Sequence, residues 1–90
     1  MNVLQTPTFI KQVKKLHKNQ KSDLDQAVRD IIKNPSIGGL KKGDLNGIQV
    51  YKFNMVNQLT LLAYEFDQGA LQLLLLALGS HENFYRDLKK

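Results

Sequence analysis

The sequence contains no cysteine and only two histidines, His17 and His81. Without cysteine, disulfides and thiolate metal sites are excluded. No acid–histidine spacing typical of a metal site occurs, so we expect neither a metal nor another cofactor. His17 borders an apolar helical stripe, which favours a packing role at the edge of the core. No Gly-x-Ser-x-Gly elbow is present, so serine-type chemistry is not expected either.

Long apolar runs are also missing. The stretch "LQLLLLALG" is far too short to cross a bilayer, and the beginning "MNVLQTPTF" lacks the basic start and apolar core of a secretion signal. We therefore expect a cytoplasmic protein. Its length of 90 residues predicts a single domain, residues 1–90, near the lower limit for folding on one core.

Acidic residues are scarce at the beginning of the chain. The net charge is +5 and the pI is about 9.6. The first 22 residues hold five lysines and no acid. A basic balance of this kind favours polyanionic partners through steering and counterion release. A solvated helix face explains the same lysines, and both interpretations stay open here. The lysines that could form a binding surface are Lys11, Lys14, Lys15 and Lys18.

Two amphipathic helices are predicted in the first part of the chain. Thr6 suits an N-cap, with Pro7 at the first helical position and an end near Asn19. Ser22 is expected to cap the second helix, which Pro35 stops. The apolar stripes that should face a core are Phe9, Ile10, Val13 and Leu16 in the first helix, and Leu24, Ala27, Val28, Ile31 and Ile32 in the second.

A glycine-rich connector, "PSIGGLKKGDLNG", follows the helices and is not a phosphate-binding Walker loop. Leu40 and Leu45 should pin it to the body and leave Lys41 and Lys42 outside. Three strands come next, separated by short turn-like breaks that favour antiparallel neighbours. They are "IQVYKF", "QLTLLAYEF" and "ALQLLLLALG".

The order of elements predicts an α+β fold. A short strand near Val3 precedes a two-helix hairpin, which packs on one face of a small antiparallel sheet. The last strand is apolar on both faces, so it should be central or doubly covered. The other sheet face is expected to be open, and Phe84 is the nearest residue that could cover part of it. A short helical tail should end the domain.

The polar tail "HENFYRDLKK" is the candidate working end. His81 and Tyr85 are four residues apart, so one helical turn would place them on a common face. Histidine suits proton transfer at neutral pH, and the Arg86 guanidinium suits phosphate. The alternative is a tail in which Phe84 and Leu88 dock on the sheet while the polar residues face water. The residues alone favour neither.

The whole pattern resembles the RelE/ParE superfamily of bacterial type II toxins. The resemblance rests on "TPTFIKQVKKL", "IIKNP", "GGLKKGDLNGIQVYKF", "QLTLLAYEF" and "LLALGSHENFYRDLK", which cover nearly the full length. The ending, in which Gly-x-His is followed by an aromatic residue, is most similar to the RelE and YafQ branch. The resemblance implies a small basic toxin that is neutralised by a cognate antitoxin.

Most RelE-like members cut mRNA on the ribosome without a metal, so the resemblance implies an mRNA endonuclease that inhibits translation. His81 would then be the general acid or base, with Tyr85 orienting or stacking on a base. Arg86 and Lys52 would hold the phosphate, and Glu65 is a weaker candidate base. The lysines expected to bind RNA are Lys11, Lys14, Lys15, Lys18, Lys41 and Lys42.

One feature departs from the nuclease members, which usually carry arginines on the central strands. From Ile48 to Gly79 this chain has Lys52 as its single cation. A ParE-like inhibitor of DNA gyrase without catalytic groups, and an inactive regulatory binder that acts through its antitoxin, therefore remain alternatives.

Overall fold

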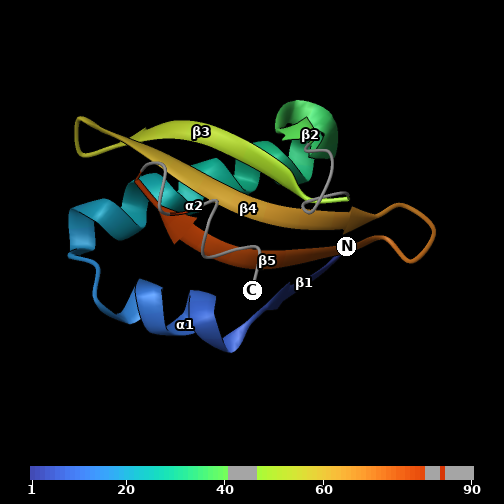
Figure 1. Cartoon of the computed structure of the whole chain (residues 1–90), viewed down its shortest axis with the longest axis horizontal. Coiled ribbons are helices and arrows are strands. Elements are labelled where there is room, and N and C mark those ends of the chain that lie inside the picture. The colour runs from blue at the N-terminus through green and yellow to red at the C-terminus, as the bar shows by residue number, and fades with distance from the viewer. Residues whose placement is uncertain (41–46, 81–83, 85–90) are drawn as a thin grey trace.

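The protein folds as two helices against a five-stranded sheet (Figure 1). The structure is a computed structural model that describes residues 1–40, 47–80 and 84. Its elements are, in chain order, β1 (Asn2–Gln5), α1 (Pro7–Lys14), α2 (Lys18–Lys33), the 3-10 helix η1 (Pro35–Ile37), β2 (Gly39–Leu40), β3 (Gln49–Met55), β4 (Gln58–Asp67) and β5 (Gln72–Gly79). Among the described residues, no helix has the length and apolar character needed to cross a membrane.

The sheet has the strand order β1-β5-β4-β3-β2. The antiparallel meander predicted from the last three strands is confirmed, since β3 pairs with β4 and β4 with β5 in that sense. The first strand, by contrast, runs parallel to β5, so the sheet is mixed. The expected helix after β5 falls on residues 81–90, of which the structure describes Phe84 alone.

Helix α1 begins where the sequence predicts, whereas α2 begins earlier than predicted. Thr6 caps α1, because its Oγ1 accepts a hydrogen bond from the Phe9 N–H at 3.1 Å. The predicted end near Asn19 is wrong, since α1 stops at Lys14. The predicted cap at Ser22 is also wrong, because α2 already begins after His17. The side-chain oxygen of a glutamine three residues on accepts the His17 N–H at 2.8 Å, which satisfies one unpaired donor of the helix start.

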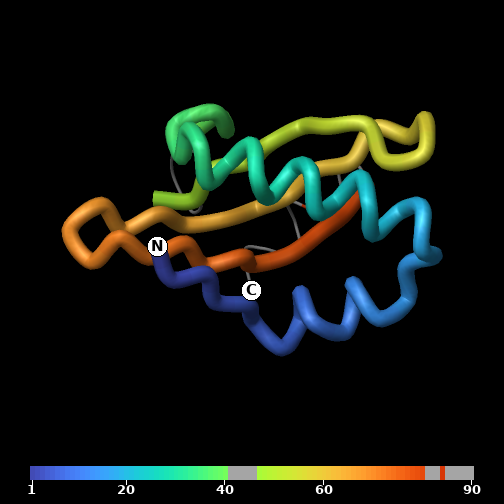
Figure 2. Tube along the Cα trace, turned by 180° about the vertical axis from the view of Figure 1, so that it is seen from behind, coloured from blue at the N-terminus to red at the C-terminus, as the bar shows by residue number. Residues whose placement is uncertain are grey.

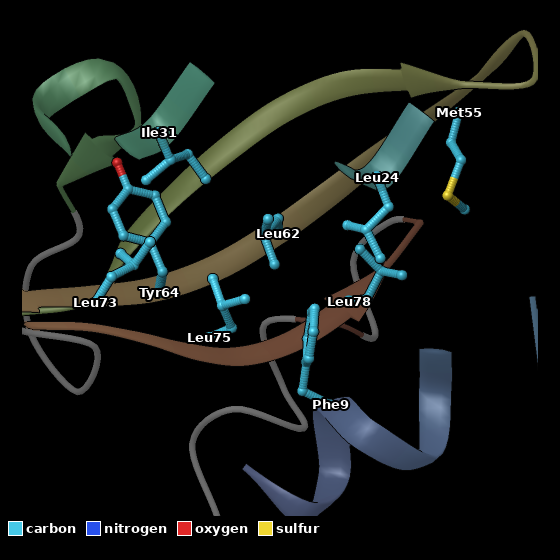
Figure 3. Packing of buried hydrophobic residues seen from close by; sticks show 9 residues of the cluster. All are labelled: Phe9, Leu24, Ile31, Met55, Leu62, Tyr64, Leu73, Leu75 and Leu78. Carbon is cyan, nitrogen blue, oxygen red and sulfur yellow. The ribbon is translucent and has the colours of Figure 1, made fainter. Parts of the chain in front are cut away.

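The main core lies between the helices and the sheet. Helix α2 crosses one face of the sheet, while α1 lies beside β5 at its margin (Figures 1 and 2). The side chains that meet there come from both helices and from β3, β4 and β5 (Figure 3). They are Phe9, Leu24, Ile31, Met55, Leu62, Tyr64, Leu73, Leu75 and Leu78. Ile10 and Ile32, which the apolar stripes also included, are exposed instead.

An irregularity in β5 explains how an all-apolar strand serves both faces. Ala63 pairs with Ala77, but the next residue of β4, Tyr64, pairs with Leu75, which leaves Leu76 as an extra residue. A bulge of this kind shifts the side-chain alternation by one position. Leu75 and Leu78 both point to the helices, although they are three residues apart. The prediction that this strand is covered on both faces is confirmed, because Ala77 is buried on the other side.

The connector after α2 is held by a buried polar network rather than by leucine. Leu40 is 64% exposed, so the prediction that it pins the connector is wrong. The Tyr64 hydroxyl donates to the Pro35 carbonyl oxygen at 2.6 Å and accepts the Gly38 N–H at 2.9 Å. The Gln49 side-chain amide donates to the Pro35 carbonyl oxygen at 2.9 Å. Leu45 lies outside the described residues.

Candidate functional site

The sheet face turned away from the helices carries its own small apolar cluster. The prediction that this face is open is wrong in part, since Phe84 covers its centre and is only 6% exposed. The prediction that Phe84 acts as the cover is confirmed. The cluster is formed by Val50, Leu61, Ala63, Ala77 and Phe84, with Ile48 and Leu76 packed against it.

Gly79 makes room for this cover. A Cβ atom on Gly79 would lie 2.5 Å from Cδ1 of Phe84 and 3.0 Å from its Cβ. Real Cβ atoms do not approach other atoms that closely, so the aromatic ring sits where a side chain of residue 79 would be. The last residue of β5 and the anchor of the tail are therefore in direct contact, and only glycine permits this approach.

Lys52 lies on the same face as Phe84. It is two residues from Val50, so strand alternation turns both side chains away from the helices. Its partner across β3 and β4 is Leu61, which pairs in turn with Gly79 on β5. Lys52, Leu61 and Gly79 thus form one row across the sheet. The lysine is exposed at one end of this row, and the contact with Phe84 is at the other.

Glu65 is also exposed on this face, but at a distance from that row. It stands opposite Leu74 on β5, four residues along β4 from Leu61. At about 3.3 Å per residue, this places it roughly 13 Å along the strand from the row that holds Lys52. The two charged residues share a face and are not brought together.

The predicted tail residues His81, Tyr85 and Arg86 lie outside the described residues, as do Lys41 and Lys42. Their roles stay predictions. Phe84, which lies between His81 and Tyr85 in the sequence, is described, and it packs on the face that also exposes Lys52.

The predicted basic surface is exposed along the two helices. Lys11 and Lys14 lie in the last turn of α1, Lys15 is its C-cap, and Lys18 begins α2. All four are exposed. His17, which stands between them, is exposed at the start of α2. The prediction that His17 packs at the edge of the core is therefore wrong, because α1 ends at Lys14 and His17 caps α2 instead of continuing the apolar stripe of α1.

Hydrogen bonds from two polar side chains to the outer edge of β5 were not predicted from the sequence. The Thr6 hydroxyl donates to the Leu76 carbonyl oxygen at 2.7 Å. The Gln12 side-chain amide donates to the Leu78 carbonyl oxygen at 2.6 Å, and its oxygen accepts the Leu78 N–H at 2.7 Å. A glutamine on the border of an apolar helical stripe was the only available signal, and it does not specify a partner far along the chain.

An apolar groove opens between α1 and α2 below β1. Its volume is about 370 Å³, and charged groups at its rim come from α2. The groove is lined by Val3, Gln5, Phe9, Val13, Leu24, Asp25, Val28, Arg29 and Leu75. It lies on the helical side of the molecule, which also carries the exposed lysines.

Comparison with known proteins agrees with this architecture. Residues 3–89 match the family model described as the ParE-like toxin of type II bacterial toxin–antitoxin systems. No curated protein matches the chain. The chain belongs to this family of ParE-like toxins, because the match covers nearly its whole length.

Solved structures of toxins share the fold at low sequence identity. The intact RelBE toxin–antitoxin complex of E. coli aligns with a TM-score of 0.73 and 15% identity, over 90% of this chain and 96% of that one. The YoeB/ParE toxin from Agrobacterium tumefaciens gives a TM-score of 0.70 and 14% identity, over 91% and 100%. The RelBE2 complex from Mycobacterium tuberculosis gives 0.69 and 19%, over 89% and 96%.

Proposed function

We propose that this toxin is a metal-independent, ribosome-dependent mRNA endonuclease that inhibits translation. The observation that carries the proposal is the packing of Phe84 against Gly79, in the same cross-strand row as Lys52. Phe84 packs on the face that also exposes Lys52, and in the sequence it is three residues from His81, one from Tyr85 and two from Arg86.

Cleavage of RNA without a metal has three requirements. The 2′-hydroxyl must lose a proton, the charge on the phosphate must be stabilised, and the leaving 5′-oxygen must gain a proton. In our proposal His81 performs a proton transfer, Arg86 clamps the phosphate through its planar guanidinium, and Tyr85 stacks on a base.

Lys52 supplies the second positive charge of the proposed site. Its ammonium group is exposed beside the apolar cluster under Phe84, where a phosphate could be held without burying a charge. Glu65 lies roughly 13 Å along β4 from this row, so it is the weaker candidate for the base. The proposed site therefore centres on Lys52 and the tail.

A cognate antitoxin is the proposed protein partner. Two of the similar solved structures are toxin–antitoxin complexes, from E. coli and from M. tuberculosis. The basic surface of Lys11, Lys14, Lys15 and Lys18 suits an acidic antitoxin or ribosomal RNA, because either one offers opposite charge. The apolar groove between the helices offers the same antitoxin a second, uncharged contact.

Inhibition of DNA gyrase is the second candidate function. It is favoured by the family model, which is described as ParE-like, and by the strands, where Lys52 is the single cation between Ile48 and Gly79. A gyrase inhibitor acts by binding and has no need of arginines aimed at a phosphate.

An assay of mRNA in a translation extract separates the two functions. Endonuclease activity predicts new mRNA 5′ ends at codon-related spacing in the presence of ribosomes. Lys52→Gln should reduce this cleavage about tenfold or more, whereas Lys33→Gln, which removes an exposed lysine at the end of α2, should not. Intact mRNA together with gyrase trapped on DNA would instead support the second function.

A further inference from the structure

The side-chain amide of Gln12 in α1 makes the backbone hydrogen bonds that a neighbouring strand would otherwise make at the end of β5. Its amide nitrogen donates to the Leu78 carbonyl oxygen at 2.6 Å, and its amide oxygen accepts the Leu78 N–H at 2.7 Å. Both backbone groups of one residue are thus bonded by one side chain from an element 66 positions away in the sequence. This pair of bonds is the only one of its kind that we find among the described residues.

The position of this contact is the point where β5 loses its strand neighbour. Strand β1 pairs with β5 up to Gln5 and Leu75, and the Thr6 N–H still donates to the Leu75 carbonyl oxygen at 3.1 Å. Beyond that residue the outer edge of β5 would have unpaired backbone groups, which are costly when water is excluded from them. The Thr6 hydroxyl bonds Leu76, and the Gln12 amide bonds Leu78.

The residue that Gln12 bonds, Leu78, directly precedes the glycine on which the anchor of the tail packs. Leu78 is followed by Gly79, on which Phe84 packs. A shift at the end of β5 would therefore move Gly79 relative to its partner Leu61 on β4, which belongs to the same apolar cluster as Phe84. The edge contact made by Gln12 and the face contact made by Phe84 therefore hold two consecutive residues, Leu78 and Gly79.

We propose that Gln12 is a positioning residue that fixes the end of β5 and, through Gly79, the place where Phe84 packs on the sheet. The link between this position and toxicity rests on the function proposed above. The positioning itself does not, because it concerns only described residues. Gln12 touches no proposed substrate group and acts through the backbone of Leu78.

Two substitutions separate the two bonds. Gln12→Met keeps the length and removes both bonds. Gln12→Glu keeps the acceptor for the Leu78 N–H but places a second oxygen against the Leu78 carbonyl, where no proton is available. The matched control is Gln26→Met. Gln26 is exposed on α2, and among the described residues its amide bonds to Asp30 and Arg29 of the same helix alone.

Amide hydrogen exchange measures the proposed role directly. In Gln12→Met we expect the exchange of the Leu78 amide, and of the Ala77 and Gly79 amides that pair with β4, to accelerate about tenfold or more, because the two hydrogen bonds that hold the end of β5 are lost. The Leu62 amide in the centre of β4 should change by less, since it reports global unfolding. Gln26→Met should leave all four unchanged. Equal acceleration at Leu62 and Gly79, or no change at Leu78 and Gly79, would overturn the proposal.

Measurements on the unsubstituted protein keep the proposal testable if Gln12→Met fails to fold. The side-chain amide protons of Gln12 should exchange more slowly than those of Gln26, and should show a nuclear Overhauser contact to Leu78. Slow exchange of the Gln12 side-chain amide together with a contact to Leu78 would support the proposal. Equally rapid exchange of the Gln12 and Gln26 side chains, with no contact to Leu78, would overturn it.

Growth arrest gives the second readout. Accelerated exchange at Gly79 together with a loss of toxicity in Gln12→Met, at a temperature where the protein stays folded, supports both the positioning role and the tail as the working end. Partial recovery in Gln12→Glu, which retains one of the two bonds, would strengthen this result. Accelerated exchange with full toxicity supports the positioning role and contradicts the function proposed for the tail.

Discussion

The Tyr64 hydroxyl donates a hydrogen bond to the Pro35 carbonyl oxygen, 2.6 Å away, from a side chain that is completely buried. The same hydroxyl accepts the Gly38 N–H, so a single oxygen holds both ends of η1 against the sheet. A Cβ atom on Gly38 would lie 2.7 Å from that oxygen, which explains why the connector has glycine at this position. The Tyr64 hydroxyl, together with the Gln49 amide, thus fastens the connector to the core.

Removal of this hydroxyl should destabilise the fold. We expect Tyr64→Phe to lower the free energy of unfolding by about 1–3 kcal/mol, because the buried Pro35 and Gly38 groups lose a partner. Tyr51→Phe is the matched control. Its hydroxyl bonds to Asp30 at 3.3 Å from a partly exposed ring, so we expect a change below about 1 kcal/mol. Denaturant unfolding of both variants tests this, and equal losses would contradict the assigned role of Tyr64.

Alkaline pH should lower the stability of the fold because Tyr64 loses its proton. Burial raises the pKa of Tyr64 above its usual value, although the hydrogen bond from the Gly38 N–H opposes this. A raised pKa in the folded state means that the contribution to stability is complete below the unfolded pKa of about 10 and is lost as the pH rises through the folded pKa. Melting temperatures from pH 8 to 12 should fall above pH 10 and fall less steeply in Tyr64→Phe.

The contact between Phe84 and Gly79 predicts a pair of coupled substitutions. Phe84→Ala should lower the free energy of unfolding by about 3 kcal/mol, as is usual for a buried aromatic residue. Gly79→Ala should also destabilise the protein, because its new methyl group occupies the place of the ring.

The double variant tests whether these two effects have one cause. Once the ring is gone, the methyl group of Gly79→Ala has space, so the double variant should be more stable than the sum of the single losses implies. Strict additivity in denaturant melts would show that the two residues do not meet. Leu71→Ala, at an exposed turn residue, serves as the control for loss of apolar surface.

The tail substitutions test the proposed chemistry apart from the fold. His81→Ala and Arg86→Ala should abolish growth arrest while the protein still folds and binds its antitoxin. Loss of a proton-transfer group typically reduces the rate about 100- to 10,000-fold. Arg86→Lys keeps the charge and loses the bidentate fork, so a large loss with lysine would indicate a geometric phosphate clamp. Full toxicity of both alanine variants would favour gyrase inhibition instead.

Charge reversal tests the basic helical surface. Lys14 and Lys33 each lie in the last turn of a helix, so a glutamate costs a similar unfavourable interaction with the helix dipole at both positions. Lys14→Glu should weaken binding to the antitoxin or the ribosome at low salt, with a smaller effect at high salt. Lys33→Glu should change binding less. Equal effects of the two variants would mean that only net charge matters.

Periodicity and turn chemistry were enough to predict the arrangement of the long elements. Thr6 and Pro7 marked the start of α1 correctly, and short breaks marked the two hairpins of the meander. The start of α2 was missed because Ser22 is a common cap residue, whereas the cap at His17 depends on Gln20 three residues later. The parallel pairing of β1 was missed because its partner lies at the opposite end of the chain.

The candidate site was less predictable than the fold. Phe84 was identified as a cover from its place after an apolar strand, and it is buried on the predicted face. Glu65 and Lys52 were grouped by chemistry, but strand register sets them well apart, and register cannot be read from composition. Gln12 was missed because a side chain that replaces a strand neighbour has no local sequence signal.

The parallel pairing of β1 with β5 affects the order in which the toxin can become complete during its synthesis. Gln72, the partner of Asn2 in this pairing, lies 70 residues (72 minus 2) further along the chain and is translated correspondingly later. Strand β1 and the groove beneath it therefore cannot form on a nascent chain that lacks β5. A toxin with such long-range contacts cannot finish folding until β5 has been translated. An antitoxin that is already present can therefore bind the toxin as soon as it folds.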